Sequence, residues 1–370
     1  MNRKKSFFDK LTFSPVPIKA AVHALFIYKI KYTPRRLWNL FLILFSMLIS
    51  KIIRIPIVWG YPPMVMVDPS NICNLRCPMC PMYNGTVQLP KGKLKYSNLT
   101  KLLDEIGPYV FQIQFWNQGE PFLNKNFIKM IRYAKTKGVM TITSTNGHFI
   151  DTDEMAEQVV TSGLDQIIFS MDGTNQETYE KYRVNGNYNL VIANLERLSK
   201  AKIRLKSKTP LIELQFIVFK HNQDEIDQLK ALAKKNKIDR ISFKAAMVYS
   251  TDQADKFLST EQFNELYKTD SDGKHLKRKN DIPNWCNRLW LNPALTWDGL
   301  FSPCCFDLDA KYAFANMFED NKTFKEIWHG EKYYNFRKTV LNNRQKIDIC
   351  KNCTEGMQQP YAQIIELDKL

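Results

Sequence analysis

The stretch PSNICNLRCPMCPMY, residues 69–83, places three of the chain's eight cysteines within eight positions. Cys73, Cys77 and Cys80 follow the spacing Cys-x3-Cys-x2-Cys. Three thiols are one short of a tetrahedral zinc site and an odd number for a disulfide framework. A cubic iron–sulfur cluster normally takes four cysteines, so three would leave one iron open to a small-molecule ligand. The stretch favours such a cluster, with zinc completed by a histidine or a distant cysteine as the alternative.

The chain around this stretch alternates short β-rich runs with amphipathic helical stretches between residues 62 and 250. Such alternation indicates βαβ units and a parallel sheet. Helices are expected in the intervening segments, for example at 98–107, 124–138 and 222–236. The predicted fold is therefore α/β, a partial (β/α)6 TIM-like barrel. Its six expected strands cover residues 64–70, 110–121, 139–147, 164–173, 211–220 and 238–247.

Unusual polar residues follow the first four predicted strands. The cysteine stretch follows the first strand, QGEP (118–121) the second, STNG (144–147) the third and SMDG (170–173) the fourth. In parallel α/β folds the chemistry gathers at the carboxyl ends of the strands. Each short motif alone is typical of a turn, but four motifs at one end of a barrel predict a functional site there.

The other five cysteines all lie beyond residue 285: Cys286, Cys304, Cys305, Cys350 and Cys353. Four ligands in two groups could hold an iron–sulfur cluster or a zinc ion, and spacing alone does not choose between them. A purely structural metal site is an alternative for this region.

The 370-residue composition is that of a globular protein long enough for two domains, and its formal net charge is +16. Residues 1–60 carry eleven Lys and Arg against one Asp. This asymmetry predicts an anionic contact, and a long aliphatic run favours a membrane surface over nucleic acid. No secretory signal is evident, so the cysteines are expected to be cytoplasmic and reduced, which favours metal over disulfides.

The apolar run LWNLFLILFSMLIS, residues 37–50, carries no charge. Thr33 is suited to cap a helix over it, Pro34 fits the first turn, and Pro56 stops any helix that continues past the run. As a helix the run is about 21 Å long, shorter than a bilayer core of about 30 Å. Three interpretations stay open: a helix packed on the catalytic domain, an interfacial anchor that makes the protein peripheral to the membrane, and a true span.

The motif CNLRCPMC resembles the signature of radical S-adenosylmethionine (SAM) enzymes. Gly119 and Glu120 in QGEP resemble the second Gly and the Glu of the family's Gly-Gly-Glu motif, with Gln118 in the first Gly position. In the family this segment binds the amino group of the cofactor's methionine. Met79 departs from the aromatic residue that members often place before the third cysteine. The resemblance covers roughly residues 62–250.

Further strand-end residues carry the resemblance. Ser170 and Asp172 in SMDG look like the ribose-contacting motif after the fourth strand, and Asn146 joins them as a cofactor-binding candidate. Arg183 in YEKYRVNG resembles an arginine that many members place near the cofactor carboxylate.

The resemblance implies the cofactors and the reaction. A [4Fe-4S] cluster on the three cysteines would donate one electron to bound SAM, after reduction by an external donor such as flavodoxin or ferredoxin. The resulting 5′-deoxyadenosyl radical would abstract hydrogen from an unidentified substrate. Peptide or protein side chains and sugars or lipid-linked glycans are the candidates. The alternative function is a non-catalytic zinc or iron–sulfur protein, acting as an electron carrier or a binding module.

The C-terminal cysteines resemble the SPASM/twitch extensions of the same family. Cys286 and Cys304 have the spacing Cys-x12-Gly-x4-Cys, and residues 324–340 are similar to the helix between the cysteine groups of these extensions. A full SPASM domain supplies more cysteines after the last pair, and none follows Cys353 here. The resemblance therefore implies one auxiliary cluster in the twitch-like arrangement, held by Cys286, Cys304, Cys350 and Cys353.

Cys305 could replace Cys304 as a ligand or serve as a small buried hydrophobe. The expected organisation is a basic helical extension, a barrel, a linker, an auxiliary-cluster domain and a tail. Their predicted ranges are 1–60, 61–255, 256–284, 285–357 and 358–370.

Overall fold

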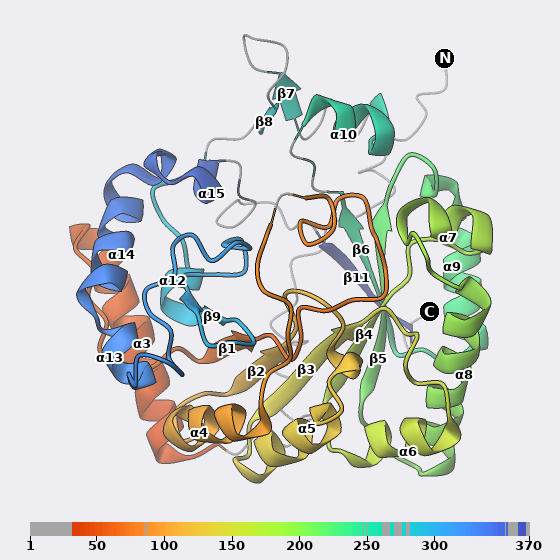
Figure 1. Cartoon of the computed structure of the whole chain (residues 1–370), viewed down its shortest axis with the longest axis horizontal. Coiled ribbons are helices and arrows are strands. Elements are labelled where there is room, and N and C mark those ends of the chain that lie inside the picture. The colour runs from red at the N-terminus through yellow and green to blue at the C-terminus, as the bar shows by residue number, and fades with distance from the viewer. Residues whose placement is uncertain are drawn as a thin grey trace.

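The computed structural model of the protein describes residues 32–85, 87–246, 248, 250–260, 267–269, 276–278, 282–351, 353 and 362–367. Most of the expected N-terminal extension, residues 1–31, lies outside the described residues. Figure 1 shows a curved sheet with helices along its outer side.

The sheet has nine strands within the described part of the chain, and its central six, β1 to β6, are parallel and in chain order. All six predicted strands are confirmed, each shorter than predicted. At the carboxyl ends of the first four, the polar motifs lie mostly outside the strand and form the loops that follow. In spatial order the strands are β10 (Phe301–Ser302), β9 (Ala294–Leu295), β1 (Met64–Val67), β2 (Gln112–Phe115), β3 (Met140–Thr145), β4 (Gln166–Ser170), β5 (Leu211–Val218), β6 (Arg240–Ala245) and β11 (Ala362–Glu366).

The helices that connect the parallel strands bury one apolar face each, as the sequence pattern predicts. Side-chain caps fix several starts: Thr152, Asn175 and Asn187 each accept a hydrogen bond from a backbone N–H of the first turn. The connecting helices are α4 (Tyr96–Ile106), η1 (Pro121–Leu123), α5 (Phe127–Thr136), α6 (Asp153–Thr161), α7 (Gln176–Tyr182), α8 (Tyr188–Arg204), η2 (Gln223–Glu225) and α9 (Ile226–Lys235), with α10 (Thr251–Phe257) after β6.

The cysteine-rich C-terminal segment shares the barrel's sheet. β9 pairs in parallel with β1, β10 returns antiparallel to β9, and β11 pairs antiparallel with β6 at the other edge. The predicted single helix over 324–340 is wrong in one respect, because the first helix ends at Trp328 with His329 as its C-cap, and Gly330 is the N-cap of a second helix. The helices here are α12 (Arg288–Leu291), α13 (Phe324–Trp328), α14 (Glu331–Asn343), η3 (Arg344–Lys346) and α15 (Asp348–Lys351), and β7 (Tyr267–Thr269) pairs with β8 (Leu276–Arg278).

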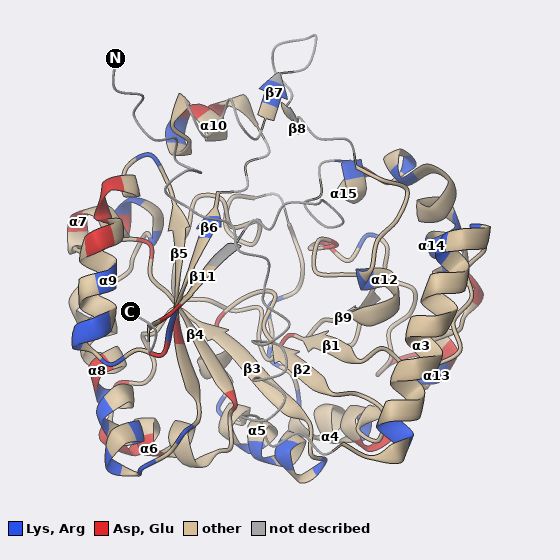
Figure 2. Cartoon of the chain, turned by 180° about the vertical axis from the view of Figure 1, so that it is seen from behind, with Lys and Arg blue, Asp and Glu red and all other residues tan. Residues whose placement is uncertain are grey.

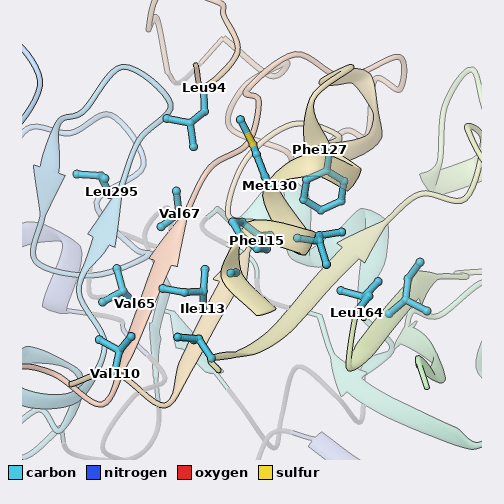
Figure 3. Close-up of a cluster of buried hydrophobic side chains, with 14 of the residues drawn as sticks. Val65, Val67, Leu94, Val110, Ile113, Phe115, Phe127, Met130, Leu164 and Leu295 are labelled. Carbon is cyan, nitrogen blue, oxygen red and sulfur yellow. The ribbon is translucent and has the colours of Figure 1, made fainter. Parts of the chain in front are cut away.

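One apolar core runs from the barrel into this segment. Val65 and Val67 of β1 lie between Ile113 of β2 and Leu295 of β9, as Figure 3 shows. These four side chains are at most 1% exposed and belong to one cluster. Burial of this kind contributes about 1.5–3 kcal/mol per large aliphatic side chain. The core therefore couples the barrel to the C-terminal segment energetically.

Helix α3 (Pro34–Ile53) confirms the predicted cap, because the Thr33 hydroxyl accepts a hydrogen bond from the Arg36 N–H. Its Arg36 guanidinium is buried and donates to the carbonyls of Gly107, Lys137 and Gly138 at 2.6–2.7 Å. The expectation of a helix packed on the catalytic domain is therefore confirmed. By length and composition α3 could also cross a membrane, with a mean hydropathy of 1.7 over its most apolar window.

We expect Leu295→Ala to lower the free energy of unfolding by about 2–5 kcal/mol, because it opens a cavity in the shared core. Denaturant unfolding should still show one cooperative transition. Leu205→Ala, at a 41% exposed position, is the control and should change stability by no more than about 0.5 kcal/mol. Separate melting of the C-terminal segment, with the barrel transition unchanged, would contradict the shared core.

Candidate functional site

Cys73, Cys77 and Cys80 line one cavity of about 450 Å³ at the carboxyl ends of the strands. The loop that carries them is fixed locally. The Tyr83 hydroxyl donates to the Cys73 carbonyl at 2.7 Å and accepts from the Cys73 N–H at 2.8 Å. The Cys80 N–H donates to the Cys77 carbonyl at 2.9 Å, which closes a turn between the second and third cysteines. Tyr83 is a positioning residue that the spacing of the motif did not reveal.

The three thiols suit a cation that can displace their protons. Burial raises the pKa of Cys73 to about 11 and raises the pKa values of Cys77 and Cys80. A bound metal would hold them as thiolates and release those protons. An all-thiol donor set beside a cavity fits an iron–sulfur cluster with an open position.

Zinc at the loop would need a fourth ligand, and His148 and His221 are the candidates among the histidines of the sequence. Among the described residues, no three His, Cys, Asp or Glu side chains converge on the position of a single metal ion, and this holds for the three cysteines of the loop as well. The His148 ring is also engaged elsewhere, because its Nε2 accepts from the Asn187 N–H at 3.0 Å and its Nδ1 lies 3.0 Å from the Asn146 side-chain oxygen.

Gly119 brings the loop after β2 against the start of the cysteine loop. Its φ is +68°, and a Cβ at this position would lie 2.3 Å from the Ser70 carbonyl oxygen. The next residue, Glu120, donates its N–H to the Ile72 carbonyl at 2.8 Å. Only glycine permits this approach, because it has no Cβ and tolerates a positive φ.

Glu120 is 1% exposed and lines the cavity. Its carboxylate accepts hydrogen bonds from the Thr145 hydroxyl at 2.8 Å and from the Asn146 N–H at 2.7 Å. Burial nevertheless raises the pKa of Glu120 to about 7, because these donors offset only part of the desolvation. The Asn146 amide also lies 3.6 Å from the Cys73 sulfur. Asn146, in the motif after β3, thus connects the Glu120 carboxylate to the cysteine loop.

Arg183 and Ser170 line the cavity, whereas Asp172 is not among the described residues that do. Asp172 is 0% exposed; it accepts from the Ile217 N–H at 2.7 Å and from Arg183 Nε at 2.6 Å. Burial lowers the pKa of Arg183, but the Asp172 carboxylate and the Cys77 thiol outweigh burial and hold it above its usual range. The Arg183 guanidinium reaches the Cys77 sulfur at 3.8 Å.

The ribose-contacting role expected for Asp172 stays a prediction, and the structure adds a contact that the sequence did not suggest. Both of its carboxylate oxygens are already engaged, and the carboxylate lies behind Arg183. Asp172 therefore holds Arg183 at the cavity wall. The sequence motif alone could not distinguish this role from direct contact, because the partner lies eleven residues away in the following helix–loop segment.

Cys286, Cys304, Cys350 and Cys353 are each buried in the C-terminal segment. Burial raises the pKa of Cys304 above its usual range, and the neighbouring thiols of Cys305, Cys286 and Cys353 raise it further. Cys286 likewise contributes to the raised pKa of Cys350. Cys305 differs from these four, because it is only partly buried and lines the cavity of the barrel.

The C-terminal segment completes the wall of that cavity. Cys305, Phe306 and Leu308 line it together with the cysteine loop and with Lys244 of β6. The Gln118 side chain donates to the Leu308 carbonyl, so the residue in the first Gly position of the family motif connects the two parts.

Two family profiles match the chain. The radical SAM superfamily profile matches residues 67–233, and an iron–sulfur cluster-binding SPASM profile matches residues 286–354. The chain belongs to the radical SAM superfamily. It carries the [4Fe-4S] cluster and SAM of that family and the auxiliary iron–sulfur site of a SPASM domain.

Characterised relatives are distant enzymes and cofactor-processing proteins. The chain is 26% identical to the tungsten-containing aldehyde ferredoxin oxidoreductase cofactor-modifying protein of Pyrococcus furiosus, over 80% of this chain and 88% of the relative. It is 28% identical to the Fe-coproporphyrin III synthase of Methanosarcina barkeri, over 49% of this chain and 43% of the relative. The chain spans less than half the length of that second relative.

Solved structures share the fold. Streptococcus suis SuiB bound to S-adenosylmethionine superposes with a TM-score of 0.59 at 15% identity, over 81% of this chain and 74% of SuiB. The anSMEcpe structure with bound AdoMet gives a TM-score of 0.55 at 18% identity, over 82% and 93% of the two chains. These structures show the fold, whereas the radical SAM and SPASM profiles show an enzyme that cleaves SAM reductively.

We expect Gly119→Ala to reduce SAM cleavage by roughly ten- to hundredfold. Backbone strain and the contact with Ser70 should cost about 1–3 kcal/mol at the loop that supports Glu120. Gly85→Ala is a matched control, because Gly85 also has a positive φ (+85°) but nothing lies within 4 Å of a Cβ there. Formation of 5′-deoxyadenosine measures the effect, and equal losses in both variants would contradict the role of close approach.

We expect Asp68→Asn to flatten the pH dependence of stability. Asp68 is buried, one carboxyl oxygen has no hydrogen-bond partner, and burial raises its pKa from 3.8 to about 8. The folded protein therefore favours the protonated carboxyl, so the stabilising contribution of Asp68 is full below pH 3.8 and is lost progressively as the pH rises from there through about 8. Melting temperatures between pH 6 and pH 9 should fall for the wild type and fall less for the variant. Parallel curves would contradict the raised pKa.

Proposed function

We propose that the protein cleaves SAM at the Cys73–Cys77–Cys80 loop and uses the resulting radical to abstract hydrogen from a substrate in the same cavity. The observation that carries this proposal is the single cavity itself. It is lined by the three cysteines, by the motifs that follow β2, β3 and β4, and by residues of the SPASM segment. Its volume of about 450 Å³ falls in the range of small-molecule sites.

In this proposal the three cysteines hold the [4Fe-4S] cluster, which, when bound, supplies one electron for cleavage of the SAM sulfonium bond. The Glu120 carboxylate accepts the amino group of the cofactor's methionine. Gly119 permits the approach that positions Glu120, and Arg183 presents its guanidinium to the cofactor carboxylate.

Two further residues orient the cofactor and the loop. Ser170, at the end of β4, offers a hydroxyl to the ribose, and Asn146 steadies the cysteine loop through its contacts with Cys73 and Glu120. Asp172 acts through Arg183 as a positioning residue. Closure of the cavity by the SPASM segment would keep water from the radical.

The substrate would enter against Lys244, Cys305 and the apolar wall formed with Phe306 and Leu308. SAM alone would occupy much of the cavity, so the substrate is proposed to insert one group rather than its whole mass. A peptide or protein side chain, or a sugar of a lipid-linked glycan, fits this requirement. Two relatives are named a cofactor-modifying protein and a mycofactocin maturase. These names support a substrate that is a precursor of a cofactor or of a modified peptide.

Cys286, Cys304, Cys350 and Cys353 are proposed to hold one auxiliary cluster with every position filled by protein. The burial of all four thiols supports this set, since Cys305 is only partly buried. Such a cluster would relay electrons or order the segment, and an external one-electron donor such as flavodoxin or ferredoxin would supply the active cluster.

The test uses chain that is reconstituted and purified without oxygen, with assays of iron, sulfide and 5′-deoxyadenosine. We expect about eight irons per chain, four for each cubic cluster. Cys77→Ala should abolish 5′-deoxyadenosine formation and keep the auxiliary iron. Tightly held zinc without cleavage would favour the electron-carrier or binding-module alternative, and cleavage by a pure Cys77→Ala protein would overturn the proposal.

A second pair of variants tests the auxiliary ligands. Cys304→Ser should lose about four irons per chain, whereas Cys305→Ser should retain all of them, because Cys304 is buried whereas Cys305 is only partly buried and lines the cavity of the barrel. The reverse pattern of iron loss would assign the ligand to Cys305 instead.

A further inference from the structure

Helix α3 and the residues after it carry most of the exposed large apolar surface that the structure describes. Eleven of the fifteen exposed large hydrophobic residues lie between positions 32 and 59. We define the outer face of α3 as Leu37, Trp38, Phe41, Leu44, Phe45, Leu48, Ile52, Ile53, Ile55 and Trp59, which are 41–71% exposed. Exposed apolar patches of this extent mark interaction sites in soluble folds.

Aromatic rings run along the outer face in a continuous row. Ring centroids are 5.3 Å apart between Trp38 and Phe41, 5.6 Å between Phe41 and Phe45, and 5.8 Å between Phe45 and Trp59. A Trp therefore stands near each end of the row. Rings with an apolar body and one polar N–H are favoured at the boundary between hydrocarbon and head groups.

The polarity of α3 is inverted relative to an ordinary surface helix. Its buried side chains are Arg36, Asn39, Ile43, Ser46 and Ser50, so four of five are polar and face the protein. A surface helix normally buries its apolar stripe and exposes its polar one. Here Arg36 and Asn39 bond to backbone carbonyls outside the helix. Ser46 and Ser50 bond within α3 and to the segment just after it, and the apolar side is turned outward.

The inner contacts hold α3 firmly to both parts of the molecule. Arg36 binds three backbone carbonyls of the barrel, and Asn39 Nδ2 donates to the Tyr61 carbonyl at 2.9 Å. The indole N–H groups of Trp290 and Trp328 donate to the carbonyls of Ile57 and Gly60, both at 2.9 Å. Moving α3 into a bilayer as a span would break these bonds and place the Arg36 charge in hydrocarbon.

We propose that the outer face of α3 inserts into the interfacial zone of a lipid bilayer. The helix then lies parallel to the membrane surface, and the rest of the enzyme lies on the aqueous side. The 20-residue helix presents a strip about 30 Å long, typical of interfacial amphipathic helices. This inference is independent of the proposed reaction.

The charge around the outer face selects an anionic surface. No Asp or Glu occurs between residues 32 and 67, while the exposed Arg35, Lys51 and Arg54 lie at the two ends of α3. Figure 2 shows α3 tan along most of its length. Basic residues beside an apolar strip attract anionic lipid head groups. A second copy packed on the same face would instead bring like charges together, because the face offers no carboxylate to pair with them.

The test is co-sedimentation of the full reconstituted chain with vesicles of phosphatidylcholine alone or mixed with phosphatidylglycerol. We expect binding that increases with phosphatidylglycerol and weakens with added salt. Phe41→Asp with Phe45→Asp should reduce the bound fraction at least about tenfold, because each buried phenyl ring favours partition by about that factor. The matched control is Ile203→Asp with Leu205→Asp, also exposed but distant in sequence, which should bind as the wild type does.

A second measurement needs no charged substitution. Lipids brominated on their acyl chains should quench the fluorescence of the wild type and quench the Trp38→Phe, Trp59→Phe double variant less. Absence of vesicle binding by the intact chain would overturn the proposal. So would a dimer in solution that the Phe41 and Phe45 substitutions dissociate, because the face would then bind another copy. Binding lost on deletion of residues 1–31 but kept in the Phe41, Phe45 variant would also overturn it.

Discussion

The site depends on one close approach, between the backbone of Gly119 and the backbone of Ser70 and Asn71. Two strand-end loops that are about fifty residues apart in sequence meet there without a side chain between them. The hydrogen bond from the Glu120 N–H to the Ile72 carbonyl is a direct result of that contact. Everything that a cofactor would meet, from the cysteine thiols to the Glu120 carboxylate, is placed relative to this junction.

The junction also explains how the barrel and the SPASM segment form one cavity. Gln118, just before Gly119, reaches the Leu308 carbonyl, and its own N–H binds the buried Asp68 at the end of β1. β9 pairs with β1 directly behind this point. The auxiliary segment is therefore part of the wall against which a substrate would bind, with Cys305 on the cavity side and Cys304 on the side of the buried thiols.

Local patterns in the sequence predicted the six parallel strands, the α3 cap at Thr33 and the gathering of polar motifs at one end of the barrel. They could do so because period, capping and turn chemistry act over a few residues. Contacts between residues far apart in the sequence could not be predicted from these local patterns. The pairing of β9 with β1 and β11 with β6 depends on partners in distant segments, and the engagement of Asp172 by Arg183 depends on how a loop folds back. The burial of the polar side of α3 could not be predicted for the same reason, because an uncharged run does not indicate which side of the helix packs on the protein.

The central claim is that two separate iron–sulfur sites exist and that SAM binds only the one at Cys73, Cys77 and Cys80. Electron paramagnetic resonance of the reduced protein, recorded with and without SAM, tests it most directly. The account predicts two overlapping signals, of which one changes when SAM is added. In a variant with all three of these cysteines replaced by alanine, one signal should remain and be insensitive to SAM. A remaining signal that still responds to SAM, or a wild-type spectrum that SAM leaves unchanged, would contradict the account.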